Sequence, residues 1–277
     1  MTWYAIEVRA DPAIRDDVAG WLVRHTGQAI EERADGTLVS FASDRPGADR
    51  LVRDLQQFPL AQVSAQLSPV AEVDWATSWR EGLGARHIGS VVLTPSWIGY
   101  VPQPDEVVVT VDPETAFGSG EHGSTRGALS LMALGLRPGD TVVDLGTGSG
   151  VLAIAALKLG AGRAIAIDLD PEAARVAQRN AELNGVADRI VVLEGDALKW
   201  LPVIEPADLV VSNILRSVNL RLIPAIRGVL PPGAVAVFAG MEQAEAPEFR
   251  PHLLGSGFRV ADETIDENWW SVAARRT

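Results

Sequence analysis

The sequence contains no cysteine, and this absence excludes several kinds of chemistry. Disulfide bonds, thiol nucleophiles and metal sites with cysteine ligands are all impossible. No uncharged apolar run approaches the roughly 18 residues that a transmembrane helix requires. Glu7 and Arg9 also interrupt the N-terminus before any signal-peptide core could form. We therefore expect a cytoplasmic protein that has no membrane partner.

Positive charge is also scarce. The 24 Lys and Arg residues stand against 36 Asp and Glu, so the formal net charge is −12. Nucleic acids and anionic membranes bind clusters of Lys and Arg, so we expect no direct nucleic-acid contact, whereas a basic protein would be a suitable partner. The 4 histidines are scattered without the spacing of metal ligands, so no metal site is predicted.

The length and composition are those of a globular protein with one large or two modest domains. Of the 277 residues, 47% are hydrophobic and 22% are charged. We predict a small α+β domain over residues 1–70, a linker with a short helix over 71–90, and a larger domain over 91–277. The linker helix, expected over 74–82, would pack Trp75 and Trp79 at the domain junction.

The first domain has the order strand, helix, strand, strand, helix, strand. An Asp35-Gly36 turn separates its two central strands, and Asp11-Pro12 and Pro46-Gly47 mark the starts of its helices. This order predicts a ferredoxin-like split βαβ sandwich. The expected strands cover residues 3–8, 29–32, 37–41 and 62–67.

From residue 91 onward, strands and helices alternate. Short apolar strands between helices predict an α/β domain with a mostly parallel sheet covered on both faces. Residues 257–274 predict an antiparallel hairpin that turns at Asp266-Glu267. The expected parallel strands cover residues 107–111, 141–144, 164–168, 190–193, 209–212 and 234–239.

A glycine-rich turn follows the strand that ends in Asp144. Gly146, Gly148 and Gly150 permit a tight turn and the close approach of a ligand at the start of the next helix. A dinucleotide fingerprint would need glycine at Val151, and the Asp144 carboxylate would repel a pyrophosphate. The cationic groups of S-adenosylmethionine suit that carboxylate better, so we predict this cofactor over NAD, with Asp144 and the three glycines at its site.

Three further polar residues end neighbouring strands. Asp168 is placed to accept hydrogen bonds from two ribose hydroxyls, whereas Asp170, before Pro171, is expected to cap a helix. Asp196 could read the adenine amino group, and a turn role is nearly as good an explanation. Asn213 offers both a donor and an acceptor beside the reactive methyl group, with capping of the next turn as its alternative.

An unusual segment, residues 112–125, precedes the helix before the glycine-rich turn. Its three glycines, hydroxyl side chains and His122 are typical of a loop folded against a ligand. Ser124 and Thr125 are the preferred cofactor contacts in it. His122 is the one candidate for a general base near neutral pH.

Together these motifs resemble the PrmA family, whose members methylate ribosomal protein L11. The resemblance rests on five ordered segments: residues 112–125, 144–150, 152–161, 168–171 and 212–215. It implies a class I methyltransferase fold with a seven-stranded, Rossmann-like sheet, a substrate-recognition domain at the N-terminus, and methylation of lysine and N-terminal amines. It also implies cofactor contacts at Thr125, Gly146, Asp168 and Asn213.

The loop departs from the family pattern. Glu114 replaces the usual glycine, residues 119–123 lack the usual Thr-Gly-Thr-His-Pro, and Asn268 replaces a glutamate before Trp269. The substrate is therefore less constrained than the cofactor. A related lysine methyltransferase acting on another protein, such as a flavoprotein subunit, is one alternative. A small-molecule methyltransferase and a non-catalytic binding module are the others.

The expected chemistry needs few catalytic groups. A lysine amine, with a pKa near 10.4, must lose a proton before it attacks a methyl group, and burial beside a positive sulfur lowers that pKa. We expect the protein to align and desolvate the amine, with Asn213 orienting it and Phe117 forming a wall of the pocket. We expect the protein to act as a monomer.

Overall fold

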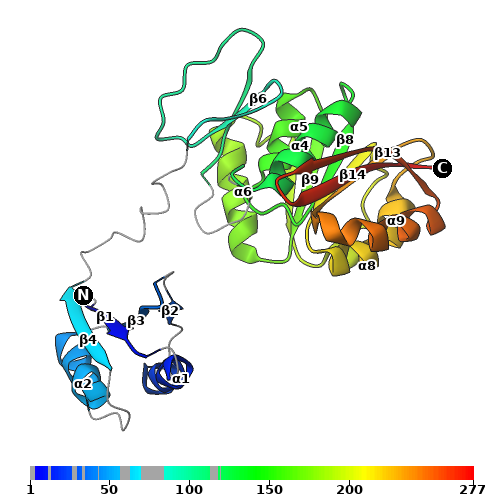
Figure 1. Ribbon diagram of the computed structural model, residues 1–277. Helices are drawn as coiled ribbons and strands as arrows, with labels where there is room; N and C mark the ends of the chain where they lie inside the picture. Colours follow the sequence, from blue (N-terminus) through cyan, green and yellow to red (C-terminus); the bar gives the residue numbers. More distant parts are fainter. Residues whose placement is uncertain are drawn as a thin grey trace. The chain divides into compact units, whose positions relative to one another are not determined.

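The structure is a computed structural model that describes residues 4–11, 14–26, 30–32, 35–42, 44–56, 63–69, 84–112, 118 and 120–277. It divides into two compact units, Met1–Glu81 and Gly82–Thr277 (Figure 1). The helix expected over 74–82, with Trp75 and Trp79, lies outside the described residues. In the described ranges no helix has the length and apolar character needed to cross a membrane.

The first unit is an antiparallel sheet with two helices. The strand order β2-β3-β1-β4 and the chain order β-α-β-β-α-β are those of the ferredoxin-like fold, as predicted. Ile6, Val8 and Leu38 from the sheet form a buried core with Leu22 from the first helix and Leu55 from the second. The elements are β1 (Tyr4–Arg9), α1 (Arg15–Thr26), β2 (Glu31–Glu32), β3 (Leu38–Ala42), α2 (Arg45–Gln56) and β4 (Ser64–Pro69).

The second unit is built on a seven-stranded sheet of order β10-β9-β8-β11-β12-β14-β13. The first five strands in this order are parallel, and the last two form an antiparallel hairpin, which confirms the predicted α/β fold. The strand order reverses between β8 and β11, and ligands of such sheets bind outside the carboxyl ends of the strands at this point. The strands are β8 (Thr141–Leu145), β9 (Arg163–Asp168), β10 (Ile190–Glu194), β11 (Leu209–Asn213), β12 (Val235–Glu242), β13 (Phe258–Asp266) and β14 (Trp269–Arg276).

Helices cover both faces of this sheet (Figure 1). The alternation of strand side chains divides the core: Val142 packs in one cluster with the first three helices, and Val143 packs in the other with the last helices. One face carries α4 (Gly123–Gly135), α5 (Val151–Lys158) and α6 (Pro171–Leu183). The other carries α7 (Ala197–Trp200), α8 (Arg216–Val229) and α9 (Ala246–Gly255), with the short 3-10 helix η1 (Gln243–Glu245) before α9.

One predicted strand belongs elsewhere. Residues 107–111, expected in the parallel sheet, contribute β7 (Val107–Thr110) to a separate sheet with β5 (Arg86–Ile88) and β6 (Val91–Thr94). The prediction was wrong because the far edge of β7 finds partners on a helix. The side chains of Asn180, on α6, and of Asn184, its C-cap residue, form hydrogen bonds with the backbone of Asp112 and Thr110 at 2.6–3.2 Å. Strand β5 falls within residues 71–90, where a linker was expected.

Candidate functional site

The glycine-rich turn connects β8 to α5. Gly146, Gly148 and Gly150 have φ of 68°, 54° and 82°, in the left-handed region that favours glycine. Space is also short: a Cβ on Gly146 would lie 2.3 Å from Cγ2 of Ile214, and one on Gly150 would lie 3.0 Å from Cβ of Ala177. The turn can therefore approach its neighbours, or a ligand, only because these residues have no side chain.

Asp144 lies fully buried at the base of this turn. Its Oδ2 accepts hydrogen bonds from Thr147 Oγ1 at 2.6 Å and from the Ala153 amide at 3.2 Å. Burial raises the pKa of Asp144 to about 7; the bonds from Thr147 and Ala153 oppose the rise, and the Asp168 charge adds to it. Its Oδ1 is buried without a partner among the described residues. One carboxyl oxygen of Asp144 thus holds the turn, and the other is left without a hydrogen bond from the described residues.

Asp168 ends the neighbouring strand β9 and is tied to the same turn. Its Oδ2 accepts from the Gly148 amide at 2.8 Å, and its Oδ1 accepts from the Asp170 amide at 3.0 Å. These two bonds fix the carboxylate while each oxygen keeps a further lone pair. Asp170 caps α6 by accepting from the Glu172 amide, as the sequence predicted.

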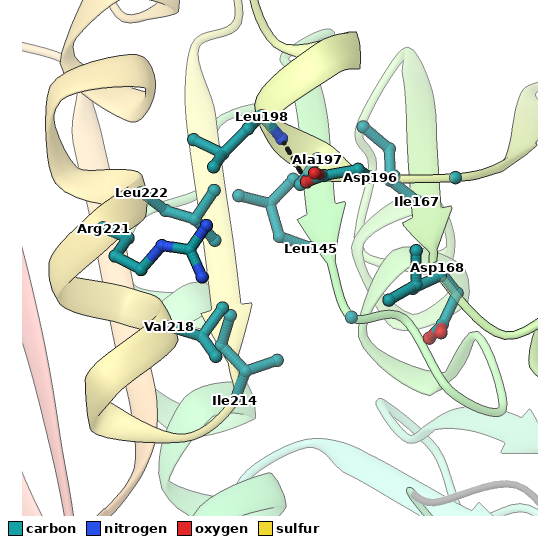
Figure 2. Close-up of a pocket in the computed structure, with 13 residues that line it drawn as sticks. Leu145, Ile167, Asp168, Asp196, Ala197, Leu198, Ile214, Val218, Arg221 and Leu222 are labelled. Atoms are coloured by element: carbon teal, nitrogen blue, oxygen red, sulfur yellow. Dashed lines mark hydrogen bonds between the residues drawn. The ribbon is translucent and has the colours of Figure 1, made fainter.

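A cavity of about 330 Å³ opens beside Asp168, between α7 and α8 (Figure 2). Asp196 caps α7 on one side, where its Oδ1 accepts from the Leu198 amide at 2.9 Å. The walls are mostly apolar. The lining residues are Leu145, Gly146, Ile167, Asp168, Leu169, Gly195, Asp196, Ala197, Leu198, Ile214, Val218, Arg221 and Leu222.

Asn213, the last residue of β11, meets the first turn of α4. Its Nδ2 donates to Oγ1 of the fully buried Thr125 at 3.3 Å. Its Oδ1 is buried and has no partner among the described residues. A buried amide oxygen without a donor is unfavourable, so this position suits a ligand that carries an N–H group.

His122 precedes this turn of α4. Its Nδ1 lies 2.7 Å from Ser124 Oγ, and its ring centroid lies 4.2 Å from that of Trp269. Burial lowers its pKa, the Arg126 charge lowers it further, and Glu267 opposes both effects. The lowered pKa favours the neutral form of His122, and one of its ring nitrogens is already engaged by a hydroxyl group.

The structure gathers the predicted residues into three groups. Gly146, Asp168 and Asp196 line the cavity, and Thr125 and Asn213 share a hydrogen bond. Asp144, Gly148 and Gly150 form the turn. Like Thr125 and Asn213, they are not among the residues that line the cavity, so the contact of these five residues with a cofactor stays a prediction. Phe117 lies outside the described residues.

Sequence reasoning missed the apolar part of the cavity. The sequence pattern indicated the helices that carry Leu198 (α7), Val218 and Leu222 (both α8). It did not indicate that these side chains face the cavity at the strand ends. The spacing of Val218 and Leu222, four residues apart on one helix face, is the feature that could have indicated it.

Comparison with known proteins identifies the family. The family model described as ribosomal protein L11 methyltransferase (PrmA) matches residues 8–277. The chain belongs to the PrmA family. Among its relatives, the ribosomal protein L11 methyltransferase of Pelotomaculum thermopropionicum is 41% identical over 227 residues, which cover 78% of this chain and 73% of that protein. The protein of the same name from Thermus thermophilus is 40% identical over 207 residues, covering 75% and 79%.

A solved structure agrees with this assignment. The crystal structure of a ribosomal protein L11 methylase from Lactobacillus delbrueckii subsp. bulgaricus has a TM-score of 0.65 and 31% sequence identity to this chain. The match covers 70% of this chain and all of the other, 100%. The PrmA-family chain is thus a class I methyltransferase, and its cofactor is S-adenosylmethionine.

The residues present fit this cofactor. The apolar cavity suits an adenine ring, and the fixed Asp168 carboxylate at its edge suits a ribose diol. The unpartnered Oδ1 atoms of Asp144 and Asn213 would suit cationic or N–H groups, although neither residue lines the cavity. A pyrophosphate would instead bring negative charge toward the carboxyl groups of Asp144 and Asp168.

Proposed function

We propose that this PrmA-family protein methylates lysine side-chain amines and the N-terminal amine of ribosomal protein L11, acting as a cytoplasmic monomer. The observation that carries this proposal is the extent of the family match, which starts at residue 8 and so includes the small α+β unit. A glycine-rich turn alone would favour any class I methyltransferase. A match that also spans the first unit favours the protein substrate of this family.

The protein's own residues would align the acceptor amine. When bound, S-adenosylmethionine supplies a methyl group activated by a positive sulfur. Asn213 Oδ1 would accept a hydrogen bond from the amine, and the bond from its Nδ2 to Thr125 fixes the orientation of the carboxamide. Deprotonating a free lysine at pH 7 costs about 4–5 kcal/mol, and a dry site lowers that cost because it disfavours the ammonium form.

The remaining roles follow the same division. Gly146, Asp168 and Asp196 would hold the adenosine part in the cavity, while Asp144, Gly148 and Gly150 shape the turn beside it. Phe117 would form part of the wall around the acceptor. The domain of residues 1–70 would bind the ribosomal protein, the 71–90 segment would link it, and residues 91–277 would carry out the transfer.

The test is transfer of labelled methyl groups into a bacterial extract whose own L11 is unmethylated. We expect label in one small basic protein, on lysines and an N-terminal amine identified by mass spectrometry. The Asn213→Ala variant is the control and should label that protein about 100-fold more slowly. Label on a different protein would reassign the substrate, and no protein label despite tight cofactor binding would reject protein methylation.

A further inference from the structure

Arg86 and Glu121 form a bidentate salt bridge just before α4, the helix whose first turn carries Thr125. Arg86 Nε donates to Glu121 Oε1 at 2.7 Å, and Arg86 Nη2 donates to Oε2 at 2.6 Å. The two residues are 35 positions apart, so the pair joins β5 to the segment before α4. A guanidinium that donates to both oxygens of a carboxylate fixes the relative orientation of the two side chains as well as the distance between them.

Glu121 is held a second time through its backbone. Its carbonyl oxygen accepts a hydrogen bond from Arg126 Nη1. Arg126 also donates two hydrogen bonds of 2.7 Å to the Asp266 carboxylate at the hairpin turn. Arg126 contacts Glu267 of the same turn at 3.1 Å. The side chain of Glu121 is therefore bound to Arg86 of β5. Its backbone is bound to Arg126, which pairs with the β13–β14 turn.

Glu121 is connected to Asn213 through the first turn of α4. The next residue, His122, is the N-cap of α4, and its carbonyl oxygen accepts from the Thr125 amide at 3.0 Å. Thr125 in turn is the hydrogen-bond partner that orients the Asn213 carboxamide. None of the residues in this chain of contacts lines the adenosine cavity.

We infer that Arg86 and Glu121 are positioning residues for methyl transfer: their ion pair fixes the first turn of α4 so that Thr125 holds Asn213 in its working orientation. This inference rests on the proposed function. Because neither Arg86 nor Glu121 lines the cavity, loss of the pair should lower turnover far more than it lowers cofactor affinity. Because the Arg86 and Glu121 side chains are 46% and 34% exposed, the pair should contribute little to stability.

The experiment compares Glu121→Ala, Arg86→Ala and the exchanged pair Arg86→Glu/Glu121→Arg. We expect kcat to fall about tenfold or more in each single variant, since small displacements of aligning groups are costly to rate. The affinity for S-adenosylhomocysteine should stay within about twofold of wild type, and the exchanged pair should recover most of the lost kcat. Glu205→Ala is the matched control. It removes an exposed salt bridge with Arg163, at the start of β9 and so at the end of that strand opposite Asp168.

A second measurement is independent of activity. The side-chain NH2 signals of Asn213 in an ¹⁵N-labelled protein, assigned with Asn213→Asp, should move in Glu121→Ala and stay in place in Glu205→Ala. Unmoved Asn213 signals would reject the positioning role even if the wild-type protein methylated nothing. A variant in which kcat, cofactor affinity and Tm all fall together would reject it as well, because that result would indicate general damage to the fold. Failure of the proposed function would show instead as absent transfer by the wild-type protein.

Discussion

Asn213 and Thr125 lie 88 residues apart in the chain and share one hydrogen bond, from Nδ2 to Oγ1 at 3.3 Å. The bond joins the end of β11 to the first turn of α4, next to the point where the strand order of the sheet reverses. It occupies the donor side of the carboxamide and leaves Oδ1 buried without a partner among the described residues. The oxygen is thereby set in advance to receive an N–H donor.

Removing either side of this contact should reduce turnover. Asn213→Ala should lower kcat about 100-fold, because the amine loses the group that aligns it. Thr125→Val keeps the shape but removes the acceptor of Nδ2, and it should lower kcat about tenfold, whereas Thr125→Ser should stay near wild type. Steady-state kinetics with saturating cofactor measures this. Equal activities of Thr125→Val and Thr125→Ser would contradict the orienting role of the hydroxyl group.

The cofactor end of the site was more predictable than the acceptor end. Asp144, the three glycines and Asp168 follow strands within short segments, so local pattern and strand order sufficed to place them. The contacts of Arg86 with Glu121 and of Arg126 with Asp266 join residues 35 and 140 positions apart. No periodicity encodes such pairs, since many arginines and acids of this chain could form them.

The same reason explains the misplaced strand. The apolar run of residues 107–111 signals a buried strand correctly, but nothing in it specifies its neighbour. That choice depends on Asn180 and Asn184, which supply side-chain hydrogen bonds where another strand was expected. Asn180 also donates to the Ser149 carbonyl at 2.8 Å and so links the end of β7 to the glycine-rich turn.

Asp168 should control cofactor affinity. Asp168→Asn keeps an acceptor for the Gly148 amide but removes the charge that strengthens bonds to a diol. A lost charge-assisted hydrogen bond corresponds to about 1.5–3 kcal/mol, so the Kd for S-adenosylhomocysteine should rise about 10- to 150-fold. Calorimetry measures this, with Asp170→Asn, a change at the α6 cap, as the matched control. If both variants bind alike, the role assigned to Asp168 is wrong.

Asp144 should make stability depend on pH. Its pKa is raised from 3.8 to about 7, chiefly by burial, so the folded protein holds a proton that the unfolded chain has already released. Its contribution to stability is fully present below pH 3.8 and is lost as the pH rises through 7. Between about pH 5 and 6.5, the wild type should lose about 1.4 kcal/mol per pH unit relative to Asp144→Asn.

Urea unfolding of both proteins from pH 5 to pH 9 measures this difference. The two stability curves should diverge up to about pH 7 and run parallel above it, because Asp144 is then ionised in both the folded and unfolded states. Curves that are parallel over the whole range would show that the carboxyl group titrates in the same way in both states.

Gly146 should be replaceable only at a steric cost that Gly185 does not share. The two glycines have nearly equal φ, 68° and 66°, so alanine carries the same backbone penalty of about 1–2 kcal/mol at each. At Gly185 nothing lies within 4 Å of the new Cβ, whereas at Gly146 Cγ2 of Ile214 is 2.3 Å away. Overpacking of this kind costs about 1–3 kcal/mol, and in a domain of this size each kcal/mol lowers Tm by about 2–4 °C.

The Tm of Gly146→Ala should therefore fall several degrees below that of Gly185→Ala in thermal unfolding. Ile214→Ala removes the Cγ2 atom that causes the clash, so adding Gly146→Ala to it should cost about as much as Gly185→Ala costs alone. If the excess cost of Gly146→Ala persists beside Ile214→Ala, the constraint is not this contact. The requirement for glycine at position 146 would then come from something other than the side chain of Ile214.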